Sequence, residues 1–180
     1  MTKSEHQRFL AGDAAAAEAV VRQAGRITMP VAFAVLGDRE AAADVAQDVA
    51  LDVLRGLPRL SNPESFDAWV RRIAVRHSVR AARRRRLLRG IEFPLDEAEE
   101  TAWETPATDT VLLRASLRAA LADLSARQRA AVALRYIHGL SDAEIAEVLG
   151  CRPGTASSLL TRARDRLRRN GFLALEGGTQ

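Results

Sequence analysis

The chain has 180 residues, a formal net charge of +4 and a hydrophobic fraction of 47%. This length fits one domain or two small ones, and the abundant alanine with few aromatic residues favours helices. No uninterrupted run of about eighteen apolar residues is present, so we expect no membrane insertion. The first thirteen residues, MTKSEHQRFLAGD, lack the apolar centre of a signal peptide, which favours a cytoplasmic protein.

Cysteine and arginine usage narrows the class of protein further. Cys151 is the only cysteine, which argues against an internal disulfide and a thiolate metal cluster. Lys3 is the only lysine, and the arginines cluster at 71–89 and 162–169. Because arginine makes planar bidentate contacts to phosphate and guanine, a nucleic-acid partner is favoured. A membrane surface is the weaker alternative, since neither cluster adjoins a broad apolar face.

The first helical pattern extends from about residue 4 to residue 36. Asp13 is placed to cap the helix that begins AAAAEAVVRQ. Pro30 lies inside the pattern and should kink or interrupt the helix. Gly37 should end it, and Asp38 should cap the helix that follows.

The helix predicted at 39–57 has an apolar side and an acidic side. Its apolar side carries Val45, Val49, Val53 and Leu57. On the other side Asp44, Asp48 and Asp52 recur every four residues, with Gln47 beside them. Such a row is compatible with a solvated face, a metal site or a docking surface for a basic partner. A catalytic metal would need ligands that converge from a second element, and the sequence shows no such cluster.

A row of arginines follows on the next predicted helix. The segment 56–65 reads as a loop, and a helix should run from about residue 63 to residue 86. His77 falls on its inner side, where a packed neutral histidine is expected. One flank carries Arg72, Arg76, Arg80 and Arg83. Because aligned like charges are costly without an anion, we interpret the row as a phosphate contact rather than a solvated face.

The helical pattern breaks after residue 86. The segment 89–109 is acidic, contains two prolines and has no sustained period, which predicts an extended, flexible linker. The pattern resumes at Thr110, and one face of the new helix should pack toward the C-terminal helices through Leu113, Leu117, Ala120, Leu121 and Leu124.

The stretch 124–169 reads as helix, helix, tight turn, helix. Ser141 and Glu144 form an S-x-x-E capping box, and Leu140 and Ile145 are placed for a hydrophobic staple. Gly150 should end this short helix, and the last helix should begin near Thr155.

The last helix is apolar on one side only. Its inner positions are Ala156, Leu160, Ala163 and Leu167, and its outer positions are Ser158, Thr161, Arg162, Asp165 and Arg169. Hydroxyls and guanidinium groups suit base edges and phosphates. We therefore interpret the stretch as a helix-turn-helix rather than an ordinary helical hairpin with a solvated face, and expect Cys151 to pack in its turn.

Both halves of the chain resemble one family. The N-terminal half resembles region 2 of bacterial sigma factors in DVAQDVALDVLRGLPRL and SFDAWVRRIAVRHSVRAARRRR. The C-terminal half resembles region 4 in LADLSARQRAAVALRYIHGLSDAEIAEVLG and the T-x-S-S start of the next helix. From about residue 12 to residue 169 the chain is thus similar to the extracytoplasmic-function (group IV) sigma factors of the sigma-70 superfamily.

The resemblance implies an all-α fold of two small helical modules joined by a flexible acidic linker. Region 2 would occupy residues 1–88, the linker 89–109 and region 4 residues 110–174, with a tail at 175–180. The family consists of dissociable promoter-specificity subunits of RNA polymerase, so we expect no enzymatic activity, no cofactor and no bound metal. An anti-sigma factor is a further candidate partner.

The resemblance also assigns roles to residues. The polymerase clamp coiled coil would be bound through Asp44, Gln47, Asp48 and Asp52. The −10 element would be bound through Arg72, Arg76, Arg80 and Arg83. The −35 element would be read through Thr155, Ser157, Ser158, Thr161, Arg162 and Arg169, with region 4 on the polymerase flap. The linker would thread toward the active site and RNA exit path.

Two departures from the family pattern limit what carries over. Arg76 and Arg80 stand where the family often has Asn and Asp, and 155–160 lacks the Lys and Arg of the family's TVKSRL. The promoter sequence therefore does not follow from the resemblance. Two other functions stay open from the residues alone: a stand-alone helix-turn-helix regulator, and a DNA-processing enzyme with a metal on Asp44, Asp48 and Asp52.

Overall fold

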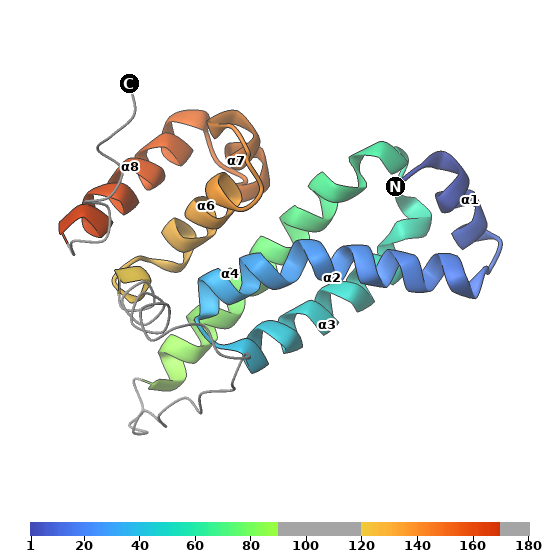
Figure 1. Ribbon diagram of the computed structural model, residues 1–180, viewed down its shortest axis with the longest axis horizontal. Coiled ribbons are helices and arrows are strands. Elements are labelled where there is room, and N and C mark those ends of the chain that lie inside the picture. Colours follow the sequence, from blue (N-terminus) through green and yellow to red (C-terminus); the bar gives the residue numbers. More distant parts are fainter. Residues whose placement is uncertain (90–119, 170–180) are drawn as a thin grey trace, which may run out of the picture.

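The structure is a computed structural model that describes residues 1–89 and 120–169, and within these ranges the regular elements are all helical. Figure 1 shows two groups of helices, which we call the N-terminal module (1–89) and the C-terminal module (120–169). The linker predicted at 89–109 lies outside the described residues except for Arg89, which ends a helix. The predicted contacts of Leu113 and Leu117 and the predicted tail 175–180 also lie outside them.

The N-terminal module consists of four α-helices and two short 3-10 turns. They are α1 (Lys3–Leu10), α2 (Ala14–Leu36), α3 (Arg39–Gly56), η1 (Leu57–Arg59), η2 (Pro63–Ser65) and α4 (Phe66–Arg89). The predicted caps are present. Asp13 accepts hydrogen bonds from the amides of Ala15 and Ala16, and Asp38 caps α3 in the same way. Gly37 ends α2 with φ of 68°, a conformation that favours glycine.

Of the kink or interruption predicted at Pro30, the interruption is wrong, because α2 runs unbroken through this residue. A proline inside a helix costs roughly 3 kcal/mol through the lost hydrogen bond and the ring clash. The adjacent Val31 and Ala32 are fully buried, and packing on both sides of the proline offsets that cost.

Three of the helices enclose the core of the N-terminal module. α2 packs against α3 and α4, and α3 packs against α4. The shared core is made by Val20, Ala24, Ile27, Ala32, Ala42, Val45, Val49, Val53, Leu57, Phe66, Val70 and Ile73. The predicted apolar side of α3 is thereby confirmed. α2 is long and apolar enough by composition to cross a membrane, but its buried residues Val20, Ala24, Ile27 and Ala32 belong to this packed interior.

The C-terminal module is the predicted helix-turn-helix. It contains α6 (Ala126–Tyr136), α7 (Asp142–Leu149) and α8 (Pro153–Arg169). Ser141 and Glu144 form the capping box at the start of α7, and Gly150 ends α7 with φ of 60°. α8 begins at Pro153, two residues before the predicted start. Its inner side is buried as expected at Ala156, Leu160, Ala163 and Leu167.

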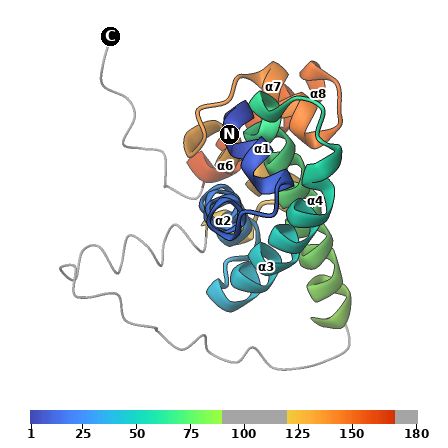
Figure 2. The ribbon, with the colours of Figure 1, turned by 90° about the vertical axis from the view of Figure 1, so that its right-hand side faces the viewer.

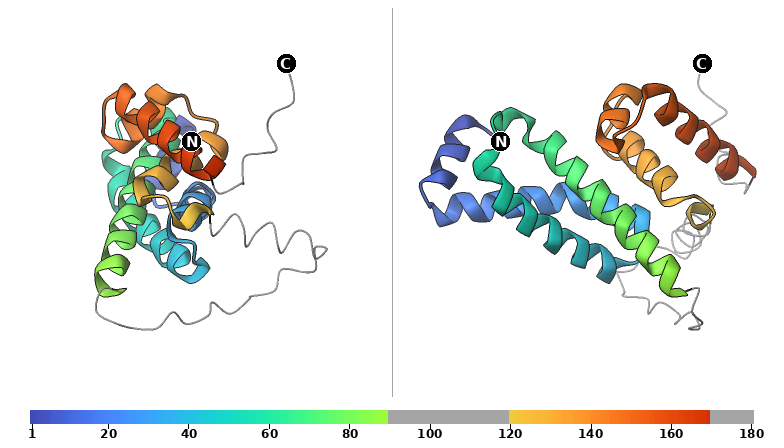
Figure 3. Two further views of the ribbon diagram at one scale, coloured as in Figure 1. Left: turned by 90° about the vertical axis from the view of Figure 1, so that its left-hand side faces the viewer. Right: turned by 180° about the vertical axis from the view of Figure 1, so that it is seen from behind.

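The two modules pack directly against each other, an arrangement that the sequence analysis did not predict. α6 packs against α2 and α4, and α7 packs against α4. Two further views show α6 and α7 beside α4 from opposite sides of the molecule (Figures 2 and 3). α8 packs on α6 and α7 and therefore lies on the far side of its module from α2.

Candidate functional site

The outer face of α8 is an exposed polar surface. Ser158, Thr161 and Arg162 are exposed there, as are Thr155 and Arg169, whereas Ser157 is half-buried at its side. The hydroxyl of Ser158 donates to the carbonyl of Gly154 at 2.8 Å, so its oxygen remains able to accept a hydrogen bond. This face combines hydroxyls, guanidinium groups and one carboxylate, Asp165, along the exposed side of the helix.

Side chains from α6 fix the position of α7 and α8. Arg135 pairs with Asp142 at the start of α7, and Arg127 donates to the carbonyl of Leu149 at its end, at 2.9 Å. The end of α8 is held by Arg166, which donates to the carbonyl of Asp123 at 2.5 Å. Because α7 is tied at both ends and α8 is buried along one side, the outer face of α8 is presented rigidly.

The arginine row of α4 is exposed but not wholly without partners. Arg80 and Arg83 are exposed, and Arg76 keeps 70% of its side chain accessible. Arg72 forms an ion pair of 3.2 Å with Glu147 of α7, and Arg76 lies 3.9 Å from Asp52 of α3. Exposed pairs of this kind contribute only about 0–1 kcal/mol, so a stronger anion can displace them.

The carboxylates of α3 separate into two environments. Asp44, Gln47 and Asp48 are exposed, and we call them the acidic patch. Asp52 is half-buried, and its Oδ2 lies 2.9 Å from Nε2 of His77 on α4. Asp52 thus joins α3 to α4, and His77 contacts a carboxylate rather than being packed only among apolar side chains.

Leu51 belongs to the same exposed surface and was not singled out from the sequence. Its side chain is 44% exposed. It follows Asp44, Gln47 and Asp48 at helical spacings of seven, four and three residues, so all four share one face. An exposed leucine beside carboxylates is what a partner with both apolar and basic groups can bind. The sequence does carry a signal for this residue, because Leu51 lies outside the stripe formed by the buried Val45, Val49 and Val53.

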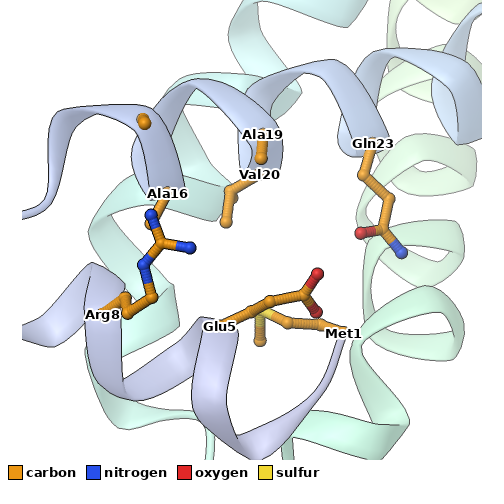
Figure 4. A pocket seen from close by; sticks show the side chains of 8 residues that line it. Met1, Glu5, Arg8, Ala16, Ala19, Val20 and Gln23 are labelled. Carbon is orange, nitrogen blue, oxygen red and sulfur yellow. The ribbon is translucent and has the colours of Figure 1, made fainter.

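No group of three His, Cys, Asp or Glu side chains that could hold a metal occurs within 1–89 and 120–169. A small hollow of about 80 Å³ lies between α1 and α2 (Figure 4). Its polar side chains are already engaged: Glu5 accepts from the amide of Thr2, Arg8 pairs with Asp13, and Gln23 donates to Asp67.

The chain matches two parts of one family. Residues 20–87 match sigma-70 region 2, and residues 114–167 match sigma-70 region 4. The extracytoplasmic-function RNA polymerase sigma factor SigE of Mycolicibacterium smegmatis is 34% identical over 153 residues, covering 83% of this chain and 59% of SigE. SigM of Mycobacterium tuberculosis, with the same description, is 31% identical over 160 residues, covering 89% of this chain and 79% of SigM.

Two solved structures share the fold. CnrH, in complex with the cytosolic domain of CnrY, has a TM-score of 0.66 at 21% identity, covering 92% of this chain and 94% of CnrH. The sigma factor RpoE of Bartonella quintana, in complex with the anti-sigma factor NepR, has a TM-score of 0.66 at 23% identity. That match covers 84% of this chain and 93% of RpoE. At these identities the likeness concerns the fold alone.

Proposed function

The chain belongs to the extracytoplasmic-function sigma factors of the sigma-70 family, and from that premise we propose that it directs transcription initiation by RNA polymerase. In this role it binds core polymerase, recognises the −35 and −10 promoter elements and leaves the chemistry to the polymerase. We assign region 2 to residues 1–88 and region 4 to residues 110–174. The protein acts in the cytoplasm, where polymerase and promoter DNA are found.

One observation supports this proposal: a single chain presents a helix with a polar, arginine-bearing outer face and an acidic patch on separate, exposed surfaces. A stand-alone helix-turn-helix regulator needs only the first of these. The outer face of α8 and the acidic patch of α3 belong to different modules, and both are exposed in the structure. The presence of both surfaces favours a subunit that joins a second protein to DNA.

The acidic patch is suited to a basic partner helix. Asp44 and Asp48 lie one helical turn apart with Gln47 beside them, and Leu51 adds an apolar contact at the end of the row. We assign this surface to the clamp coiled coil of core polymerase. Asp52 belongs to it as a positioning residue, because its carboxylate holds α3 against His77.

The outer face of α8 is suited to the −35 element. Arg162 and Thr161 are exposed near its middle, where a recognition helix in the major groove reaches base edges. Arg169 is exposed in the last turn and suits a phosphate. Thr155, Ser157 and Ser158 complete the face at its N-terminal end.

The arginine row of α4 is suited to the −10 element. Arg72, Arg76, Arg80 and Arg83 are exposed and recur about every turn, roughly 5–6 Å apart. Arginine binds phosphates and stacks on unpaired bases, and both groups become available when a strand leaves the duplex. Because the sigma factor RpoE is in complex with the anti-sigma factor NepR, we propose that an anti-sigma factor can also bind this chain.

Reversing one charge of the acidic patch should abolish binding to core polymerase. Asp48 is exposed, so Asp48→Arg leaves the helical fold intact while placing like charge against a basic partner. The measurement is the dissociation constant for core polymerase together with the circular dichroism spectrum. Glu18→Arg, an equally exposed reversal on α2 outside the patch, should bind as wild type does. Unchanged affinity of Asp48→Arg for core polymerase would overturn the assignment.

Removing the guanidinium of Arg162 should weaken −35 recognition at one base pair. Arg162→Ala should cost about 1–3 kcal/mol on the preferred sequence and relax the preference at that position. Binding of the polymerase–sigma complex to a panel of −35 variants measures both effects. Arg22→Ala is the control, because Arg22 is an exposed arginine on α2, outside the C-terminal module. Equal weakening on every variant would instead make Arg162 a phosphate contact.

Promoter opening should depend on Arg76 more than initial binding does. Arg76→Ala removes a charge and a stacking group, and each stack on an unpaired base contributes about 1–3 kcal/mol. Permanganate footprinting of the −10 bubble across a salt series, on duplex and pre-melted templates, measures opening. Wild-type opening should be strongly salt-sensitive because phosphate contacts release counterions. Arg22→Ala serves as an exposed control on α2, and normal opening by Arg76→Ala at every salt concentration would contradict the role.

A further inference from the structure

One carboxylate is shared by two neighbouring side chains of α4. Oδ2 of Asp52 lies 2.9 Å from Nε2 of His77 and 3.9 Å from Nη2 of Arg76. His77 and Arg76 are consecutive on α4, whereas Asp52 comes from α3. The contact at 2.9 Å is a hydrogen bond, and the contact at 3.9 Å is at the outer limit of an ion pair. Asp52 is thus held by His77 and attracts Arg76 only loosely.

The hydrogen bond requires a proton on Nε2 of His77. A carboxylate accepts hydrogen bonds, so the imidazole must donate from Nε2 to Asp52. The neutral imidazole with its proton on Nε2 and the doubly protonated imidazolium both meet this requirement. The contact therefore does not depend on the charge of His77.

The contact lies at the edge of the core between α3 and α4. Val53, which follows Asp52, and Ile73, one turn before His77, are buried in the core of the N-terminal module. The side chain of His77 is 23% exposed and that of Asp52 is 39% exposed, whereas 70% of the Arg76 side chain is accessible. Packing thus restrains His77, while Arg76 is able to turn toward Asp52 or toward solvent.

The place of the Asp52 carboxylate decides how well Arg76 can bind an anion. A carboxylate that binds a guanidinium directly compensates its charge and repels a phosphate approaching the same group. A carboxylate held by a neighbouring imidazole compensates that charge less. His77 and Arg76 therefore compete for Asp52, and the outcome sets how much of the Arg76 charge is available to nucleic acid.

We propose that His77 is a positioning residue for promoter opening: it holds the Asp52 carboxylate at the edge of α3 and α4, and thereby keeps the Arg76 guanidinium free for the unpaired strand of the −10 element. This inference rests on the proposed function, in which Arg76 binds that strand. His77 acts through Asp52 on Arg76 rather than by touching the strand. Without the imidazole, Asp52 binds Arg76 and competes with the strand.

The first test measures promoter opening at saturating core polymerase, so that a change in docking does not enter the result. His77→Ala should slow the appearance of the permanganate-reactive −10 bubble by about two- to fivefold, the range that an exposed ion pair supplies, with closed-complex binding much less affected. His77→Gln keeps an N–H donor and should retain most of the wild-type rate. The matched control is His6→Ala, which removes a hydrogen bond of similar length from Nε2 of His6 on α1 to the carbonyl of Leu57, at 3.0 Å.

Two double variants test the route through Arg76. Asp52→Asn removes the competing charge, so adding it to His77→Ala should restore the rate that His77→Ala loses. A purely structural role of His77 predicts the opposite, because the double variant lacks both partners of the contact. In an Arg76→Ala background, His77→Ala should cause no further loss. A further loss in that background, or no recovery with Asp52→Asn, would overturn the proposal.

The free chain gives a readout that does not involve polymerase. The nuclear magnetic resonance signal of the Arg76 Nε proton reports whether the guanidinium is bound, because binding slows exchange of this proton with water. Exchange should slow in His77→Ala and return to the wild-type rate when Asp52→Asn is added. Unchanged exchange in His77→Ala would contradict the competition for Asp52.

The outcomes separate this proposal from the proposed function. If the wild-type chain with core polymerase opens no promoter, the proposed function is wrong, and the Arg76 signal in the free chain still decides whether His77 withholds Asp52 from Arg76. If exchange slows in His77→Ala but opening proceeds at the wild-type rate, Asp52 does not compete with the strand and the proposal is wrong.

Discussion

The fold depends on how the apolar stripe of α2 is covered along its length. α2 has 23 residues and is roughly 35 Å long, and its stripe continues past the helices of its own module. Val20, Ala24 and Ile27 pack against α3 and α4, whereas Val31 and Val35 pack against the C-terminal module. Fully burying a valine contributes about 1.5–3 kcal/mol, so leaving the second part uncovered is costly. This cost is what draws the two modules together.

The surfaces assigned to partners lie outside that shared core. The outer face of α8 points away from α2, and the acidic patch is on the exposed side of α3. The arginine row of α4 differs, because Arg72 is tied to Glu147 of the other module.

Local features of the fold could be predicted from the sequence because local chemistry determines them. The caps at Asp13, Asp38 and Ser141 and the helix ends at Gly37 and Gly150 follow from short-range hydrogen bonds and backbone freedom. The buried stripes of α3 and α8 follow from helical spacing. The prediction of an interruption at Pro30 is wrong because a tertiary effect outweighs the local one. Burial of the neighbouring residues outweighs the preference of proline against the interior of a helix.

Features that join distant residues could not be predicted in this way. Helical spacing gives no sign that Val31, Val35 and Val75 are covered by residues of the C-terminal module. The pairing of Asp52 with His77, 25 positions apart, is hidden for the same reason. The roles of the surface residues came from the family resemblance, since an exposed arginine or aspartate has the same local pattern whether or not it binds a partner.

The central claim is that the chain directs polymerase to promoters, and run-off transcription tests it most directly. Purified core polymerase, with and without the chain, transcribes a library of templates with randomised promoter sequences, and the transcripts are sequenced. The account predicts that transcripts appear only with the chain and share two sequence elements about 25 base pairs apart. Identical transcripts with and without the chain, together with sequence-specific DNA binding by the chain alone, would contradict it and indicate a stand-alone regulator.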